Sequence, residues 1–298
     1  MNNHAKRDWA KYNRNLVNRG SITFWLHKEC LDSWISKSGR KGRPSFSTSV
    51  IQAGLIIKAV YNLPLRSLQG FLGSILMFLQ VDLKSPHYSL FCKRAKEVVS
   101  SLPKLSTKRP LELAIDSSGL EVRGEGEWKV KIHGREKRRG WIKLHIGVDP
   151  KTQELIAIEV TDESTADCAI LPHLIEKAPK SLKKVYADGA YDRKNCREIL
   201  SSAGIEDCIP PRKNGRIRDE SGLESRNDAL RIIRAFGNDN DAMSLWKKFS
   251  GYHTRSLAET VFSRFKKLFG DRLSSKKRIN MEVEIMFKCH VLNRMRTA

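Results

Sequence analysis

The sequence lacks the patterns that mark membrane-spanning and secreted proteins. Its longest apolar stretch, from Leu68 to Val81, is interrupted by glutamine, glycine and serine. It is also shorter than the roughly 20 residues that a helix needs to span a bilayer. The segment from Met1 to Asp8 contains no apolar run of the kind found in secretory signals. We therefore expect no membrane partner and a cytoplasmic protein.

Paired cysteine and histidine motifs are absent as well. The six cysteines stand at positions 30, 92, 168, 196, 208 and 289, and the two closest are twelve residues apart (208 − 196 = 12). No Cys-x-x-Cys or His-Glu-x-x-His pattern exists, which excludes a zinc ribbon and any comparable histidine site. The cysteines are expected to be free, mostly buried thiols in a reducing compartment. Any bound metal would have to be held by carboxylates.

Positive charge is what the sequence has in excess. Lysine and arginine number 55 against 33 acidic residues, a net charge of +22 in 298 residues, of which 40% are hydrophobic. The apolar content supports a packed core, and the length fits about two domains. So large an excess attracts polyanions, of which duplex nucleic acid is the commonest. Residues 1–105 hold 17 basic and 5 acidic residues, and their net charge of +12 is more than half of the excess.

The first third of the chain is predicted to be helical. A basic arm over residues 39–44 precedes three short helices, expected over residues 47–61, over 64–79 and from residue 85 onward. The third helix carries Lys93 and Arg94. Three short helices of which the last is basic are the layout of a helix-turn-helix module, whose last helix enters the major groove of DNA. A helical bundle with a solvated basic face is the alternative, and the pattern alone does not separate the two.

After residue 105 the hydrophobic pattern alternates between strands and helices. Strands are expected at 111–115, 140–148, 155–160, 184–187 and 207–209. Helices are expected at 166–178, 194–203, 252–269 and 282–295. No element is assigned to residues 212–240, which are basic, polar and punctuated by glycine.

This order of elements predicts the fold class. Three strands followed by helix, strand, helix, strand and helix form an α/β mixed-sheet order, which is that of the ribonuclease-H-like fold. We predict a catalytic domain of this fold over residues 106–298. An all-α, helix-turn-helix-like DNA-binding region over residues 1–105 is expected to precede it.

Two aspartates stand where predicted strands end. Asp116 follows the apolar run 111–115, and Asp188 follows 184–187. Because α/β proteins bind ligands at this edge of the sheet, the two carboxylates meet if the strands are neighbours. Like charges repel at close range, so such a pair needs a shared proton or a divalent cation, and hard oxygen ligands select Mg²⁺ or Mn²⁺. Two aspartates that cap separate turns are the alternative.

A third carboxylate, Glu259, lies in a segment with helical spacing. On a helical wheel, Glu259 shares one polar face with Tyr252, Arg255 and Lys266. The apolar stripe beside that face consists of Ala258, Phe262, Phe265 and Phe269. The spacing therefore places a carboxylate and two phosphate-binding cations at the margin of the core. A solvent-exposed ion pair between Arg255 and Glu259 is the alternative.

These residues carry a resemblance to a known family. The arrangement Tyr252-x2-Arg255-x3-Glu259-x6-Lys266 resembles the YREK signature of bacterial insertion-sequence transposases with a DDE catalytic domain. Segments 115–119 and 186–192 are similar to the two aspartate motifs of that family, and residues 250–272 to its insertion-sequence-five group. Further similar segments are 12–13, 19–21, 209–214 and 226–227.

The resemblance implies a DNA transposase that binds two Mg²⁺ ions, with Mn²⁺ able to substitute. The catalytic, metal-binding triad would be Asp116, Asp188 and Glu259. The contacts to the phosphates and end nucleotide of transposon DNA would be made by Tyr252, Arg255 and Lys266. The enzyme would bind the terminal inverted repeats of its insertion sequence, cleave at the element ends and join the 3′-hydroxyl to target DNA. Such relatives commonly act as homodimers bridging two DNA ends, and a bacterial, nucleoid-associated protein is implied.

Two other functions are left open by the sequence. The first is a catalytically silent or domesticated sequence-specific DNA-binding protein, against which the presence of all three carboxylates argues. The second is a DNA nuclease that cuts without strand transfer. Because cutting and joining would use the same residues, a strand-transfer assay is needed to separate a nuclease from a transposase.

Overall fold

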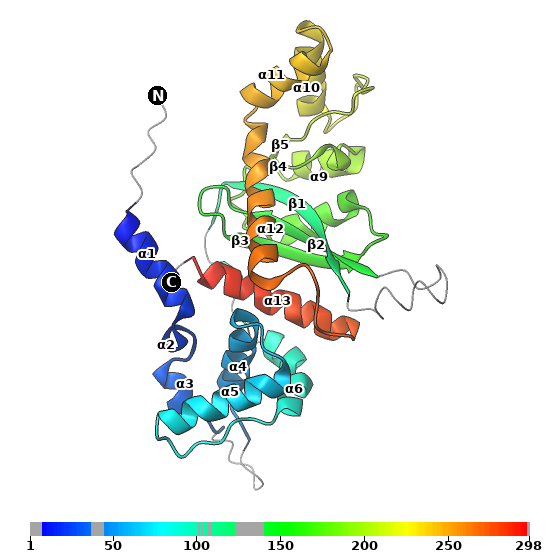
Figure 1. The fold of residues 1–298 in the computed structure, drawn as a ribbon. Coiled ribbons are helices and arrows are strands. Elements are labelled where there is room, and N and C mark those ends of the chain that lie inside the picture. The colour runs from blue at the N-terminus through cyan, green and yellow to red at the C-terminus, as the bar shows by residue number, and fades with distance from the viewer. Residues whose placement is uncertain are drawn as a thin grey trace, which may run out of the picture. The chain divides into compact units, whose positions relative to one another are not determined.

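The computed structural model describes residues 8–36, 45–100, 102, 104–106, 109–122 and 140–296 (Figure 1). The chain divides into two compact units, one formed by Met1–Lys104 with Leu273–Ala298 and the other by Leu105–Arg272. The basic arm predicted over residues 39–44 lies outside the described residues. Among the described residues, no helix has the length and apolar character needed to cross a membrane. All six cysteines are free and four of them are buried, as predicted.

The first unit is built from helices. They are α1 (Trp9–Gly20), α2 (Ile22–Trp25), α3 (Lys28–Asp32), α4 (Thr48–Val60), α5 (Leu65–Phe78), α6 (Tyr88–Ser100) and α13 (Arg278–Arg294). The Ser47 hydroxyl caps α4 by accepting a hydrogen bond from the Val50 N–H at 3.3 Å. The helices α4, α5 and α6 pack on one another at the predicted positions. Their assignment as a helix-turn-helix module stays a prediction.

The last helix packs with the helices of the first unit. Buried residues occur all around α13, among them Met281, Ile285, Phe287, Cys289 and Val291. A helix that is apolar on every side is stable only when other elements cover it. The helices α4 and α6 cover it, so α13 packs within the first compact unit, and the predicted extent of the catalytic domain to residue 298 stays a prediction.

A five-stranded mixed sheet forms the frame of the second unit. Its strands are β1 (Glu112–Glu121), β2 (Trp141–Val148), β3 (Leu155–Asp162), β4 (Lys184–Tyr186) and β5 (Glu206–Cys208). The order is β3-β2-β1-β4-β5. The first three strands pair antiparallel, whereas β4 pairs parallel with both β1 and β5. This confirms the predicted α/β class and the strand order of the ribonuclease-H-like fold.

Helices pack on both faces of β4. The helices and 3₁₀ turns of the second unit are η1 (Asp167–Ile170), α8 (Leu171–Lys177), η2 (Gly189–Tyr191), α9 (Lys194–Ser202), α10 (Glu224–Ala235), α11 (Asn240–Phe249), η3 (Tyr252–Arg255) and α12 (Ser256–Phe269). Val185 packs with residues of α8 and α9, and its neighbour Tyr186 packs with residues of α10 and α11. Successive strand residues point to opposite faces, so the two helix pairs lie on opposite sides of β4. Helix α12 packs on β1 and β2 and buries the predicted apolar stripe (Figure 1).

Two local predictions were wrong. The segment 212–240, to which no element was assigned, contains all of α10 and the start of α11. Helix α10 buries one stripe of four residues, Asn227, Ala229, Leu230 and Ile233, but the rest of the helix is polar and charged, and this overall polarity led to the missed assignment. The expected single helix over 252–269 begins instead with the 3₁₀ turn η3, which follows Gly251 in the left-handed region at φ +73°.

Candidate active site beside the end of strand β4

The parallel pairing of β1 with β4 brings Asp116 and Asp188 together. The last paired residues are Ala114 and Tyr186, and each aspartate follows its strand partner by two residues. Asp116 is paired with Ile146 and lies within β1, not at its end as predicted, because β2 continues to supply backbone partners as far as Glu121. The relevant strand end is therefore that of β4.

Asp188 caps the short 3₁₀ turn that follows it. Its side chain caps η2 by accepting a hydrogen bond from the Ala190 N–H at 2.9 Å. The turn-capping alternative is therefore correct for this residue. A carboxylate has two oxygens with several lone pairs, so one hydrogen bond leaves acceptor capacity free.

Arg255 lies between Asp116 and Glu259. Its Nη1 is 3.2 Å from Asp116 Oδ1, and its Nη2 donates to Glu259 Oε1 at 2.5 Å. The Arg255 and Asp116 side chains are each 17% exposed, whereas that of Glu259 is 54% exposed. Arg255 and Glu259 thus form the ion pair that was the alternative, and Arg255 also forms a second, less exposed ion pair with Asp116. Nη1 is buried and has no hydrogen-bond acceptor, since its pairing with Asp116 lacks hydrogen-bond geometry.

The charges at this site act on one another. Burial raises the pKa of Asp116, the Arg255 guanidinium lowers it, and the nearby carboxylates of Asp188 and Glu259 raise it further. All three carboxylates are therefore within electrostatic range. In the part of the chain that the structure describes, no three acidic, histidine or cysteine side chains are grouped closely enough to form a metal site.

The other residues of the predicted signature are placed differently. Tyr252 packs on Trp246 with ring centroids 6.2 Å apart, and Lys247 Nζ lies 5.4 Å from the centre of the Tyr252 ring. Burial raises the pKa of Tyr252, and the adjacent Arg255 lowers it. Lys266 is half-buried on α12, and its ammonium makes no bond to another described residue. The structure thus joins Arg255 to Asp116 and Glu259, with Tyr252 adjacent to Arg255, and the role predicted for Lys266 stays a prediction.

The two basic residues predicted on α6 also differ from each other. Lys93 is exposed. Arg94 donates from Nη1 to the Phe46 carbonyl at 2.6 Å and from Nη2 to Thr48 Oγ1 at 3.0 Å. The Arg94 guanidinium therefore fixes the start of α4, whereas Lys93 is available to a partner.

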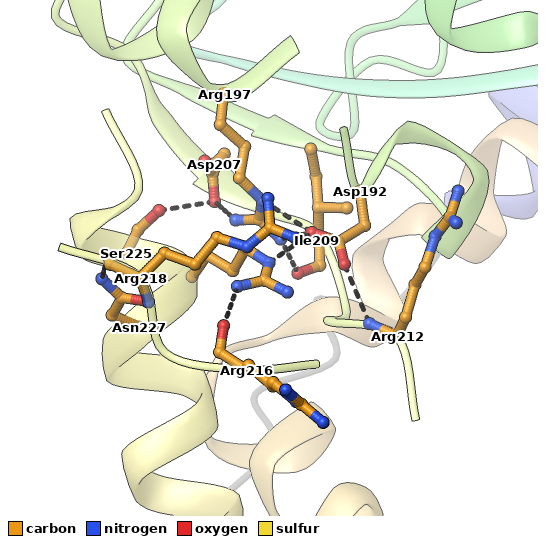
Figure 2. A network of polar contacts seen from close by, with 10 residues as sticks. Asp192, Arg197, Asp207, Ile209, Arg212, Arg216, Arg218, Ser225 and Asn227 are labelled. Atoms are coloured by element: carbon orange, nitrogen blue, oxygen red, sulfur yellow. Dashed lines mark hydrogen bonds and ion pairs between the residues drawn. The ribbon is translucent and has the colours of Figure 1, made fainter. Parts of the chain in front are cut away.

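A buried polar network that the sequence analysis did not identify lies next to η2 (Figure 2). Arg197 is fully buried and donates to Asp192 Oδ1 at 2.9 Å and to Asp207 Oδ1 at 2.6 Å. Arg226 donates from Nε to the same oxygen of Asp192 at 3.1 Å. Asp192 ends the turn that Asp188 begins. The network therefore fixes the segment that carries the second aspartate of the candidate site.

Two family models that match the chain have the same description. A family model described as "Transposase DDE domain" matches residues 107–294, and a second model with the same description matches residues 17–125. A solved structure titled "Cryo-EM structure of piggyBac transposase synaptic complex with hairpin DNA (SNHP)" aligns with a TM-score of 0.47 and 11% identity. That alignment covers 94% of this chain and 73% of the other.

Proposed function

Because the chain belongs to the family of transposase DDE domains and is a DDE-type transposase, we propose that it cleaves DNA at the ends of an insertion sequence and joins them to target DNA. The catalytic residues in this proposal are Asp116, Asp188 and Glu259. The observation that carries the proposal is Arg255, which contacts both Asp116 and Glu259 beside the end of β4. Arg255 thus links a carboxylate of β1 to one of α12, which supports the proposal.

The donor set fits Mg²⁺ or Mn²⁺. Both ions prefer carboxylate oxygens, and three ionised carboxylates exceed the single charge of Arg255. The ligands would be Asp116, Asp188 and Glu259. When bound, two such ions supply activation of the attacking oxygen, neutralisation of the phosphate charge and stabilisation of the leaving oxygen.

Two reactions at the same site would account for transposition. In the first, a water oxygen bonds to the phosphorus at the element end and the bond from phosphorus to the 3′ oxygen breaks, which releases a 3′-hydroxyl. In the second, that 3′ oxygen bonds to a target phosphorus and displaces the target's own 3′ oxygen. The number of phosphodiester bonds is unchanged in this joining step.

Arg255 and Lys266 supply cations for the phosphates in this proposal. Arg255 is a cation beside the carboxylates, and its guanidinium would donate to a phosphate oxygen of bound DNA. A guanidinium already placed beside the scissile bond stabilises the developing charge without reorganisation. Tyr252, adjacent to Arg255, would position that guanidinium.

The first test replaces each acid by its amide. Asp116→Asn, Asp188→Asn and Glu259→Gln should each lower the rate of cleavage of labelled end DNA by at least about a hundredfold. Mutation of residues that only hydrogen-bond to metal ligands already lowers activity by up to about a hundredfold. Binding to end DNA in EDTA should persist. The matched control is Glu163→Gln, which removes an exposed acid and should cut normally. A triad variant that cuts at the wild-type rate in Mg²⁺ would remove that residue from the proposal.

The second test concerns joining and assembly. A strand-transfer assay with pre-cleaved ends distinguishes a transposase from a nuclease, which would cut but not join. We further propose that two copies act on two DNA ends. The molar mass of the complex with end DNA, measured by light scattering, should then correspond to two chains, and a complex with one chain would contradict the homodimer.

A further inference from the structure

A cluster of arginines lines a hollow on the segment that links β5 to α10. The hollow measures about 390 Å³ and is lined by Arg212, Asn214, Gly215, Arg216, Arg218 and Arg226. Figure 2 shows Arg212, Arg216 and Arg218 around the buried network of Asp192 and Arg197. We call Arg212, Arg216 and Arg218 the arginine pocket.

The acids of the buried network are already neutralised. Asp192 accepts hydrogen bonds from Arg197 and Arg226 on Oδ1, and from the Arg212 backbone N–H on Oδ2 at 2.9 Å. Asp207 accepts from Arg197 and from the Ser225 hydroxyl. Two carboxylates therefore balance the two guanidinium groups of Arg197 and Arg226, and no negative charge is left for the pocket.

The three arginines of the pocket have no such partner. Their guanidinium groups form no ion pair or hydrogen bond with any other residue that the structure describes. Arg218 is near enough to Glu220 to lower the pKa of that carboxyl, but Glu220 is paired with Lys194 at 2.5 Å. The three exposed arginines line one hollow, and because neighbouring like charges repel, a bound anion would be favoured there.

The backbone that presents these arginines is held in place by buried polar groups. Asn227, which is 7% exposed, accepts a hydrogen bond from the Arg218 N–H at 3.2 Å and donates to the Arg218 carbonyl at 2.7 Å. Arg226 Nη1 donates to the Arg216 carbonyl at 2.8 Å. The segment also needs glycine, because a Cβ on Gly215 would lie 3.0 Å from both the Arg212 carbonyl oxygen and Arg226 Nη2. A preformed site loses less conformational entropy when it binds a ligand.

We propose that the arginine pocket binds the phosphodiester backbone of a DNA strand that passes the active site. Guanidinium groups match phosphate oxygens with paired hydrogen bonds, which a lysine ammonium does not. The pocket is anchored on Asp192, which ends the turn η2 that begins at Asp188, so both sites share one short turn. The proposal rests on the function proposed above in that it takes DNA as the ligand.

The test is a salt titration of DNA binding in EDTA, so that cleavage plays no part. Fluorescence anisotropy would follow labelled duplex DNA with wild type, Arg212→Gln, Arg216→Gln and Arg218→Gln. Each variant should weaken binding at low salt by about tenfold, as expected when one charge-assisted hydrogen bond to a phosphate is removed. The slope of log K against log salt should become shallower by about 0.9 for each phosphate that the variant no longer neutralises.

Two further variants separate a pocket from general charge. Arg231→Gln removes one charge from α10, where Arg231 is 62% exposed and pairs with Asp228 at 2.7 Å, and it should leave affinity and slope unchanged. Arg216→Lys keeps the charge but removes the guanidinium fork, so it should keep the slope and weaken the affinity. Melting temperatures should match that of wild type, because the pocket guanidinium groups make no bond within the described fold.

Element-end and unrelated duplexes form the two arms of the experiment. Weaker binding to end DNA alone assigns the pocket to the transposon strand, and an equal weakening with both duplexes assigns it to the backbone of any DNA. Wild-type affinity and slope in all three glutamine variants, or changes no larger than those of Arg231→Gln, would overturn the proposal.

Failure of the pocket and failure of the proposed function can be told apart. If the wild-type protein nevertheless cleaves end DNA, the proposed function stands without the pocket. If amide variants of the triad still cleave while the pocket variants bind more weakly, the catalytic assignment fails and the pocket stands.

Discussion

Replacing Arg255 by alanine removes a cation that contacts Asp116 at 3.2 Å and Glu259 at 2.5 Å. The decrease in the free energy of unfolding can be bounded from these two ion pairs. The Glu259 side chain is 54% exposed, so that pair contributes about 0.5 kcal/mol, as exposed helix pairs do. Breaking a fully buried pair costs about 3–5 kcal/mol, and partial exposure at 17% with imperfect geometry reduces the Asp116 share to about 1–2 kcal/mol. We expect a total decrease of about 2 kcal/mol in EDTA.

Divalent cation should reverse most of that decrease. In the variant, the carboxylates that Arg255 neutralised face one another without a counter-charge, so they bind Mg²⁺ more readily. A ligand at a hundred times its Kd stabilises the folded state by about 2.7 kcal/mol. In the wild type, part of that stabilisation is offset by displacing the guanidinium from Asp116 and Glu259. The difference between variant and wild type should therefore shrink to about 0.5 kcal/mol or less in saturating Mg²⁺.

Urea unfolding of both proteins, in EDTA and in Mg²⁺, measures this difference. Arg231→Ala on α10 is the control, because it removes an exposed pair to Asp228 and should show no Mg²⁺ dependence beyond that of wild type. An Arg255→Ala destabilisation of the same size in EDTA and in Mg²⁺ would refute the idea that the guanidinium and the metal compete for the same carboxylates. No destabilisation in either condition would show that Arg255 and Glu259 form a solvated pair without consequence.

Two further predictions concern the first unit. Burial alone would raise the pKa of Glu284, but Lys288 and Lys58 bring it from 4.5 to about 2. The resulting stability is fully present above about pH 4.5 and is lost as pH falls through about 2. Glu284→Gln should abolish that acid dependence in a fluorescence titration and cost about 3 kcal/mol at neutral pH, since it leaves Lys288, 6% exposed, unpaired. A fragment of residues 1–104 lacks α13, so it should show a weak helical circular dichroism signal and a lowered melting temperature. Linking residues 273–298 to that fragment should restore a cooperative thermal transition.

The features that the sequence predicted correctly are those set by local pattern. The helices α4 and α5 follow clear starts at Ser47 and Pro64, and α6 begins at Tyr88, three residues after the predicted start at Ser85. The apolar stripe of α12 is buried because its spacing matches one face of a helix. The meeting of Asp116 and Asp188 needed one further condition, that β1 and β4 be neighbours, and the fold satisfies it.

The features that were missed depend on tertiary partners. The second half of β1 contains Ser117, Ser118 and Gly119, which do not favour a strand, and it extends because β2 offers backbone partners. Arg197 sits beside the buried Cys196 in α9, and its position on that apolar face was the available signal for the network. No sequence pattern states that its partners are Asp192 and Asp207, because those interactions are set by the packing of separate segments.

The fully buried Arg197 has a role at the turn η2 that goes beyond stability. The turn is only three residues long, and its last residue, Tyr191, is 1% exposed. Asp188 caps its start, and Asp192 ties its end to Arg197, Arg226 and the backbone of Arg212. A buried ion pair often contributes little net stability compared with an apolar substitute, so stability alone is a weak reason for it. What the pair does supply is a fixed position for the end of the turn, which lies between a proposed metal ligand, Asp188, and a proposed phosphate site.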